Sequence, residues 1–328
     1  MRTTRVIIGL SVAAALFVAG CGTTEETGGA NEPAAADSGG PVTVTDSRGK
    51  EVTLDAPAKR VAATEWNAVE YLVSLGVMPV GVSDIKGYGD WASAAPLDDT
   101  PKDIGTRGEP SIDTLGTLDL DLVVVTDSLT EGALEQVEAK IPVIVINGGD
   151  AKDSLGSMFD NVDLIAKATG TEDKAAQLRS DFDAKIAEGK AEVDKLGAAG
   201  DKVAFADAWV DAGTVSIRPF VKGSLVADVF AEIGLETPWQ MEGDPVYGLA
   251  QADVEGLTQL GDVRFWYMAN EADGGDAFAD ALADNAIWKN LPFVRNDKVH
   301  RLPDSLWMFG GPLSMGQYVD AAVEALKA

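Results

Sequence analysis

Short runs of apolar residues alternate along the chain with segments whose apolar positions recur at helical spacing. Each run has the length of a buried strand, and the runs form two sets. The first set is Val61–Ala63, Val80–Val82, Leu122–Val125 and Val143–Ile146, and the second is Val203–Ala206, Thr214–Ile217, Phe265–Met268 and Val299–Leu302. Helical spacing is clear in intervening segments such as Ala68–Leu75 and Ala133–Ala139. The alternation predicts an α/β fold with parallel sheets that helices cover on both faces.

The segment Thr171–Leu196, between the two sets, has the pattern of one long amphipathic helix. Acidic residues follow Thr171 at its start, and Gly197 is suited to end it. Such a helix would be about 39 Å long, enough to connect two lobes and to restrict how far they open. A β-hairpin is predicted before the first set, at Val42–Thr45 and Val52–Leu54.

The N-terminus divides into a secretion signal and a polar tether. Residues 1–20 have a positive start and a short apolar run, which is typical of a signal peptide. Val18–Cys21 resembles the bacterial lipoprotein box, so we expect lipidation of Cys21, and residues 21–41 are too polar to fold. The predicted body comprises an N-terminal lobe at 42–170, a linking helix at 171–197 and a C-terminal lobe at 198–328. We expect the protein on the outer face of the cell membrane, held there by its lipid alone.

The charge and the rarity of two residue types exclude several classes of function. The 328 residues include 53 acidic and 26 basic ones, a net charge of −27, which argues against binding nucleic acid. A single Cys and a single His exclude an internal disulfide and Cys- or His-built metal sites. A structural role is favoured for His300, since no Gly-x-Ser-x-Gly elbow occurs. An extracellular hydrolase that uses two carboxylates stays open, although no particular pair stands out.

Aromatic and arginine residues occur where open α/β sheets bind their ligands. The aromatic candidates follow strands or fall in predicted loops: Trp66, Tyr88, Trp91, Trp209, Tyr247 and Trp307. About half of them are expected to be simply buried, as is common for such residues. Arg107 and Arg218 lie beside Gly or Pro and apolar residues, where a guanidinium faces either a ligand oxygen or a surface carboxylate.

Four segments together resemble a known family over residues 42–328. They are Arg60–Trp66, Asp103–Ser111, Ser216–Phe220 with Ser224–Leu225, and Leu306–Gly311. In order and spacing they are similar to the bacterial lipoproteins that feed ferric siderophores to ABC importers, particularly binders of hydroxamates such as ferrichrome and ferrioxamine. The resemblance implies two Rossmann-like lobes joined by one long helix, and a monomeric binding protein rather than an enzyme. Its partners would be an ABC permease and ATPase.

The resemblance also implies roles for individual residues. Arg107 matches the arginine that binds hydroxamate oxygens, and Arg218 matches a second cleft arginine of some members. Trp66, Tyr247 and Trp307 match aromatics in or near the cleft. The ligand brings Fe³⁺ already enclosed by its chelator, so no intrinsic cofactor or metal site is expected.

Two further features follow from this resemblance. Glu131 and Asp253 are the candidates for the acids that pair with permease arginines. The aromatic that relatives carry after the second strand of the first lobe is missing, because Thr126–Leu129 stands there. Other iron complexes and cofactors therefore stay open as ligands: a catecholate siderophore, haem or cobalamin.

Overall fold

A small antiparallel hairpin begins the part of the chain that the structure describes. The computed structural model describes residues 39–328, so the predicted signal peptide (1–20), Cys21 and most of the predicted tether (21–41) lie outside the described residues. Strands β1 (Val42–Thr45) and β2 (Glu51–Leu54) pair as predicted. Their buried side chains, Val44 among them, join a core cluster that also contains helix α5 (Ser154–Thr169).

The four strands of the first predicted set and one unpredicted strand, β5, form a five-stranded parallel sheet in the order β5-β4-β3-β8-β9. Its strands are β3 (Val61–Ala63), β4 (Gly81–Val82), β5 (Lys102–Asp103), β8 (Leu122–Thr126) and β9 (Val143–Ile146). The associated helices are α1 (Trp66–Ser74), α2 (Ile85–Trp91), α3 (Ile112–Leu115), α4 (Glu131–Glu138) and α5, and a short ribbon of β6 (Gly105–Thr106) and β7 (Glu109–Pro110) follows β5. Every residue of β8 is buried, which is the pattern of a central strand covered on both faces.

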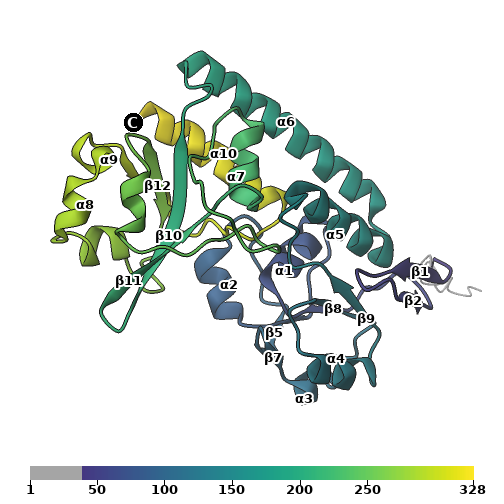
Figure 1. The fold of residues 1–328 in the computed structure, drawn as a ribbon. Coiled ribbons are helices and arrows are strands. Elements are labelled where there is room, and N and C mark those ends of the chain that lie inside the picture. Colours follow the sequence, from purple (N-terminus) through teal and green to yellow (C-terminus); the bar gives the residue numbers. More distant parts are fainter. Residues whose placement is uncertain (1–38) are drawn as a thin grey trace, which may run out of the picture. The chain divides into compact units, whose positions relative to one another are not determined.

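The second sheet has four strands in the order β11-β10-β12-β13 and is mixed rather than parallel. Its strands are β10 (Val203–Asp211), β11 (Thr214–Pro219), β12 (Arg264–Met268) and β13 (Val299–Arg301). The prediction of a parallel sheet was wrong for β11, which pairs antiparallel with β10. The connecting residues Ala212 and Gly213 both have positive φ, as a tight two-residue hairpin turn requires. In Figure 1 this hairpin extends beyond the other strands of its sheet.

Helices pack around this second sheet. They are α7 (Leu225–Glu232), the 3₁₀-helix η1 (Gly256–Gln259), the π-helix η2 (Ala277–Ala281), α8 (Ala286–Asn290), α9 (Pro292–Arg295) and the C-terminal α10 (Pro312–Lys327). Two of these helices, α9 and α10, carry a proline in the first turn, where its missing N–H costs no hydrogen bond. Within residues 39–328, no helix combines the length and apolar character that crossing a membrane requires.

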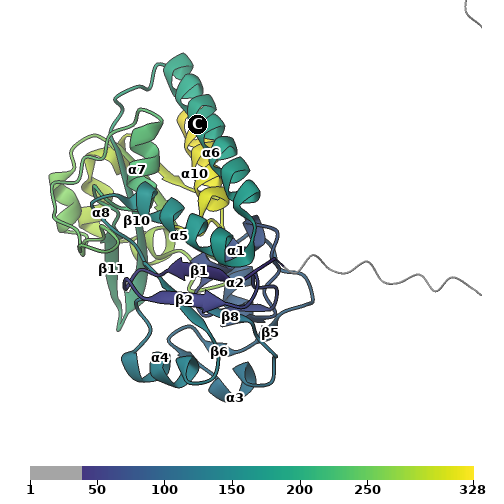
Figure 2. The same ribbon diagram turned by 90° about the vertical axis from the view of Figure 1, so that its right-hand side faces the viewer.

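The long helix α6 (Glu172–Leu196) stands between the two sets of strands in the sequence, at the predicted position. Acidic residues occupy its first turn, and Gly197 ends it with a positive φ. It lies alongside α10 in both views (Figures 1 and 2). Gly189 permits this approach, because a Cβ there would overlap the side chain of Val319 on α10.

The apolar core has three clusters, and the largest is shared by both sheets. It contains Val61 and Val124 from the first sheet, Phe205 and Trp266 from the second, and Tyr318 of α10. Each sheet has a further cluster of its own, one around Phe265 and one around Val123. The shared cluster holds the two sheets against a common set of helices, and this fixes the loops at their strand ends.

Candidate ligand-binding site

A cavity of about 560 Å³ lies between loops at the carboxyl ends of the parallel strands of both sheets. The first half of the chain contributes Glu65, Trp66, Asn67, Trp91, Arg107, Thr126 and Gly148. The second half contributes the end of β10 with Asp207 and Trp209, then Arg218, Tyr247, Leu249, Met268, Ala269, Asn270, Asp273, Gly274, Gly275, Trp307, Met308 and Phe309. Loops at this edge of α/β sheets are where ligands bind, because parallel strands all end there.

Arg107 is one of two arginines in the lining. It lies in the turn between β6 and β7, and its guanidinium carbon is 4.0 Å from the centre of the Trp66 ring. Its Nη1 atom lies 3.5 Å from Oε2 of Glu65, the residue that precedes α1. Burial raises the pKa of the Glu65 carboxyl, and the charge of Arg107 opposes that effect. Stacking and pairing restrict the guanidinium, while 37% of the side chain stays exposed.

Arg218 is the second arginine, and it faces Asp207 across the β10–β11 hairpin. Its Nε donates to Oδ1 of Asp207 at 2.9 Å, and its Nη2 donates to Oδ2. Burial raises the pKa of the Asp207 carboxyl, and hydrogen bonding to Arg218 opposes this. The guanidinium carbon lies 5.2 Å from the centre of the Phe309 ring. Each arginine of the cavity thus has a carboxylate partner and an aromatic neighbour.

Aromatic rings form a continuous wall between the two arginines. Trp307 makes edge-to-face contacts with Trp66 at 4.7 Å, Trp91 at 6.1 Å and Phe309 at 5.2 Å between ring centres. Phe309 in turn contacts Tyr247 at 5.5 Å. Such pairs add to the stability that burial provides. They give the cavity a continuous apolar surface.

Tyr247 reaches this wall from a loop of the second half. The carboxylate of Asp244 holds that loop, because it accepts backbone N–H bonds from Val246, Tyr247 and Leu249 at 2.8–2.9 Å. A Cβ at Gly148 would lie 2.5 Å from Oη of Tyr247, so glycine is required for the close approach. Burial raises the pKa of the Tyr247 hydroxyl, and nearby carboxylates add to the effect.

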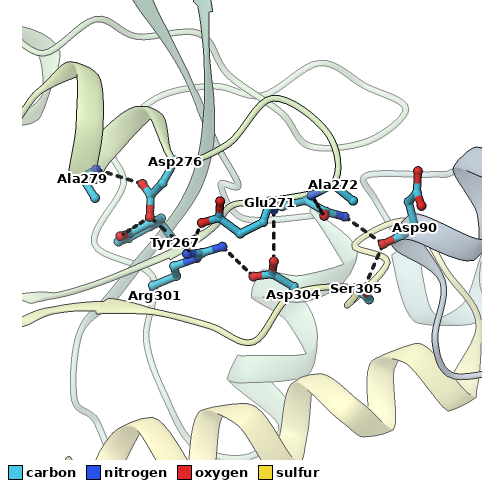
Figure 3. Close-up of polar contacts among 10 residues, drawn as sticks. Asp90, Tyr267, Glu271, Ala272, Asp276, Ala279, Arg301, Asp304 and Ser305 are labelled. Carbon is cyan, nitrogen blue, oxygen red and sulfur yellow. Dashed lines mark hydrogen bonds and ion pairs between the residues drawn. The ribbon is translucent and has the colours of Figure 1, made fainter.

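Polar contacts join the two halves at the rim of the cavity (Figure 3). The backbone carbonyl of Asp90, near the end of α2, accepts hydrogen bonds from Asn270 Nδ2 and Ser305 Oγ, both at 2.8 Å. Trp91 Nε1 donates to Oδ2 of Asp273 at 3.0 Å. Arg301 pairs with Glu271 and Asp304 and so fixes the loops that carry these groups. Loops of both sheets are therefore joined directly at the rim.

The structure brings together most of the residues that the sequence singled out for ligand binding. Those that line the cavity are Trp66, Trp91, Arg107, Trp209, Arg218, Tyr247 and Trp307. Trp209 lies within β10 rather than in a loop, and it is 45% exposed. The acids named for docking, Glu131 at the start of α4 and Asp253 before η1, are both exposed and outside the lining.

The prediction that Tyr88 binds the ligand was wrong, because Tyr88 is a core residue and does not line the cavity. Only 1% of its surface is exposed, and its hydroxyl donates to the carbonyl of Ala95 at 2.6 Å. The prediction placed it in a loop after a strand, whereas it lies inside helix α2. Helix α2 buries this one residue, so the aromatic ring points into the core instead of the cavity.

Sequence reasoning missed the carboxylates and one ring of the site. Glu65 and Asp207 each pair with a predicted arginine, and Phe309 contacts both Trp307 and Tyr247. A weak signal existed, since Glu65 directly precedes Trp66 and Phe309 lies two residues after Trp307. Asp207 gave none, because its partner becomes apparent only from the register of the β10–β11 hairpin.

Within residues 39–328, no three His, Cys, Asp or Glu side chains lie together so that they could hold a metal ion. His300 lies in β13, in register with Trp266, and is not part of the cavity lining. The arrangement is suited to holding a bulky ligand that presents apolar surface to the rings and oxygen atoms to the guanidinium groups.

Residues 61–306 match the family described as periplasmic binding protein. Among curated relatives, the iron(3+)-hydroxamate-binding protein FhuD of Escherichia coli K12 is 29% identical over 265 residues, which cover 79% of this chain and 84% of that protein.

Solved structures share the fold. The Fe³⁺–Desferal-bound siderophore-binding protein FhuD from Vibrio cholerae superposes with a TM-score of 0.73 at 22% identity, covering 82% of this chain and 98% of that one. The triscatecholate siderophore-binding protein FeuA from Bacillus subtilis, complexed with ferri-bacillibactin, gives a TM-score of 0.69 at 20% identity, covering 87% and 98%. Two proteins with chemically different ligands thus match this fold almost equally well, and the fold alone does not select the ligand.

Proposed function

The chain belongs to the periplasmic binding protein family, whose members bind ligands rather than catalyse reactions, and from that premise we propose that it binds a ferric hydroxamate siderophore and delivers it to an ABC importer. The cavity between the two sheets is the site of capture. The family assignment leaves no role for a hydrolase that uses surface carboxylates. The protein acts in iron uptake, with the chelated iron as its cargo.

One observation carries this proposal: two guanidinium groups, each beside aromatic rings, line the same cavity. Fe³⁺ is a hard cation that prefers oxygen ligands, and hydroxamates supply them before the complex meets the protein. The complex is apolar along its linkers and rich in oxygen around the iron. Aromatic rings such as Trp66 and Trp307 suit the linkers, and Arg107 and Arg218 suit the oxygens.

The relatives support a ferric ligand in general and a hydroxamate in particular. The Escherichia coli relative is named for iron(3+)-hydroxamate, and the Vibrio cholerae structure holds Fe³⁺–Desferal. A ferric catecholate is the second candidate, because the structural relative with ferri-bacillibactin matches the fold almost as well.

The proposed setting is the outer face of the cell membrane. Residues 1–20 would be removed, and lipidation of Cys21 would anchor a monomer through the tether at 21–41. The folded body comprises lobes at 42–170 and 198–328, joined by the helix at 171–197. Glu131 and Asp253 are proposed to meet arginines of the permease, which works with its ATPase.

The proposal is tested by titrating the tryptophan fluorescence of the protein with ferrioxamine, ferrichrome, a ferric catecholate, haem and cobalamin. A ligand in the cavity should quench Trp66, Trp91 and Trp307, because all three line it. We expect quenching at submicromolar concentration by a hydroxamate complex only. A Trp239→Phe variant is the matched control, since this buried tryptophan is not part of the lining. A flat response to both hydroxamates would refute the proposal.

A further inference from the structure

Both arginines of the cavity are already paired with a carboxylate of the protein. Arg107 lies beside Glu65, whose side chain is 20% exposed, and Arg218 is held at two points by Asp207, whose side chain is 10% exposed. A site designed to neutralise an anionic ligand would leave such cations unpaired. Here the protein has neutralised them itself, before any ligand arrives.

The charges around the whole cavity confirm this balance. The charged residues of the lining are Glu65, Arg107, Asp207, Arg218 and Asp273. Three carboxylates against two guanidinium groups give a formal balance of −1. Asp273 is held at the rim by its hydrogen bond from Trp91, so its charge stays next to the opening. The chain as a whole carries −27, which adds a repulsive field for any anion that approaches.

Ferric complexes differ strongly in charge although their iron centres are similar in size. Three hydroxamates carry one negative charge each, so they neutralise Fe³⁺ completely. Three catecholates carry two negative charges each, which leaves their complex triply negative. A pendant amine makes a trihydroxamate complex positive, and a pendant carboxylate makes it negative.

Resting on the proposed function, we infer that Glu65, Asp207 and Asp273 set a charge filter that accepts neutral or cationic ferric complexes and rejects anionic ones. Glu65 and Asp207 are also positioning residues, because each orients one arginine. The arginines then offer hydrogen bonds to ligand oxygens without giving the cavity a net positive charge. The acids, rather than the arginines, decide between ligands of different charge.

A series of ferric trihydroxamates with one iron centre and different arms tests this inference. One member carries a free terminal amine, the second has that amine acetylated, and the third has it succinylated, so the arm is positive, neutral or negative. We expect the wild-type protein to bind the succinylated complex about tenfold more weakly than the amine complex. The net negative charge of the partly desolvated cavity repels the succinylated arm and attracts the amine arm. The triply negative ferric triscatecholate should bind more weakly still.

Three conservative variants should change that selectivity: Glu65→Gln, Asp207→Asn and Asp273→Asn. For each variant we compare the dissociation constant of the succinylated complex with that of the amine complex. Each substitution should change this ratio about tenfold in favour of the succinylated, anionic complex. A purely structural defect would weaken the binding of all three complexes together. A charge effect is identified when the succinylated complex binds more tightly and the amine complex binds more weakly. Asp273 is exposed, and its replacement therefore keeps the test valid even if Glu65 and Asp207 are needed for folding.

Asp262→Asn is the matched control, because this acid pairs with Lys298 and lies outside the lining. It changes the charge of the chain by the same amount and should leave the ratio unchanged. Equal binding of all three trihydroxamates by the wild type, or an unchanged ratio in all three variants, would overturn the filter and leave the proposed function intact. If the wild type binds none of the three, the proposed function fails and the inference fails with it.

Discussion

The guanidinium carbon of Arg107 lies 4.0 Å from the centre of the Trp66 ring, and Glu65 adjoins both residues. The contact joins the turn between β6 and β7 to the first residue of α1. A planar guanidinium over an indole face keeps its edge available for hydrogen bonds while its charge is stabilised by the ring. The arginine is thereby held in place before a ligand binds, and little of its conformational freedom remains to be lost.

Replacing Arg107 by alanine should weaken binding of a ferric trihydroxamate about 10- to 150-fold, since ligand oxygens would lose a charged donor at a cost of about 1.5–3 kcal/mol. Arg107→Lys should recover only part of this loss, because an ammonium lacks the planar fork. Isothermal titration calorimetry measures both. Arg179→Ala is the control, as that arginine lies over Phe159 and outside the cavity. Full affinity in Arg107→Ala would contradict the assigned role.

Asp244 offers a prediction about the loop of Tyr247. Burial raises the pKa of this carboxyl, but backbone N–H bonds from Tyr247, Leu249 and Val246 outweigh it, so the pKa lies below the ordinary value of 3.8. Asp244→Ala should lower the free energy of unfolding by about 1–3 kcal/mol and weaken ligand binding, because Tyr247 loses its support. The stabilisation by Asp244 is present above pH 3.8 and is lost as the pH falls through the lowered pKa.

Urea denaturation at pH 7 and at successively lower pH compares wild type with that variant. The difference between them should shrink below pH 3.8. Asp253→Ala is a suitable control, because that exposed carboxylate caps only one N–H, that of Gly256. A difference that stayed constant down to the lowest accessible pH would show that the charge of Asp244 is not what supports the loop.

The fold could be predicted where a single element carries its own pattern. The continuous apolar run of β8 and the helical periodicity of apolar residues in α6 can both be recognised in the sequence. Strand β5 was not predicted, because Lys102 and Asp103 are both polar and exposed. The antiparallel pairing of β11 depends on the turn at Ala212 and Gly213, whose conformation has only a weak signal when alanine occupies the first position.

The site could be predicted only as a set of separate candidates. Tryptophans and arginines near strand ends are recognisable, and seven of the eight proposed ligand-binding residues line the cavity. The pairing of carboxylates with arginines depends on the tertiary structure. Glu65 is distant from Arg107 in the sequence, and Asp207 lies opposite Arg218 only because of the register between β10 and β11. Tyr88 and Trp91 lie three residues apart on the short helix α2. Tyr88 nevertheless packs in the core, whereas Trp91 lines the cavity.

Glu131 and Asp253 are predicted to serve transport without affecting ligand affinity. Both are exposed and lie outside the cavity, so reversing their charge should leave the binding site unchanged. A Glu131→Arg, Asp253→Arg double variant should reduce uptake of iron from a ferric trihydroxamate at least about tenfold, because like charges would face each other at the permease. Asp183→Arg, on the exposed side of α6, is the control. Normal uptake by the double variant would remove these acids from the docking surface.

Glu70 is predicted to be one of the most destabilising sites to truncate. This residue of α1 is fully buried, and its carboxylate accepts hydrogen bonds from the backbone N–H and hydroxyl of Ser314 in the first turn of α10. Glu70→Ala would leave those N-terminal donors buried and unpaired, which should lower the free energy of unfolding by about 2–4 kcal/mol. Glu324→Ala, on the exposed side of α10, should change it by less than about 0.5 kcal/mol. Equal effects in urea denaturation would contradict the capping role.

The same carboxyl predicts how stability depends on pH. Burial raises the pKa of Glu70 above its ordinary value of 4.5, even though hydrogen bonds from the α10 terminus oppose the shift. The folded protein therefore keeps this proton at pH values where the unfolded chain has lost it. Consequently, the free energy of unfolding should fall as the pH rises from 4.5 to the raised pKa, and level off above it.

Glu70→Gln isolates this effect, because glutamine has nearly the same shape and cannot ionise. Two other acids with a raised pKa, the partly buried Glu65 and the buried Asp207, are common to both proteins and cancel in the comparison. The wild type should therefore lose stability relative to the variant as the pH rises, when both are followed by urea denaturation. Parallel curves for the two proteins would mean that the buried carboxyl ionises as readily in the folded protein as in the unfolded chain. The bonds to the start of α10 would then fully offset the desolvation of Glu70.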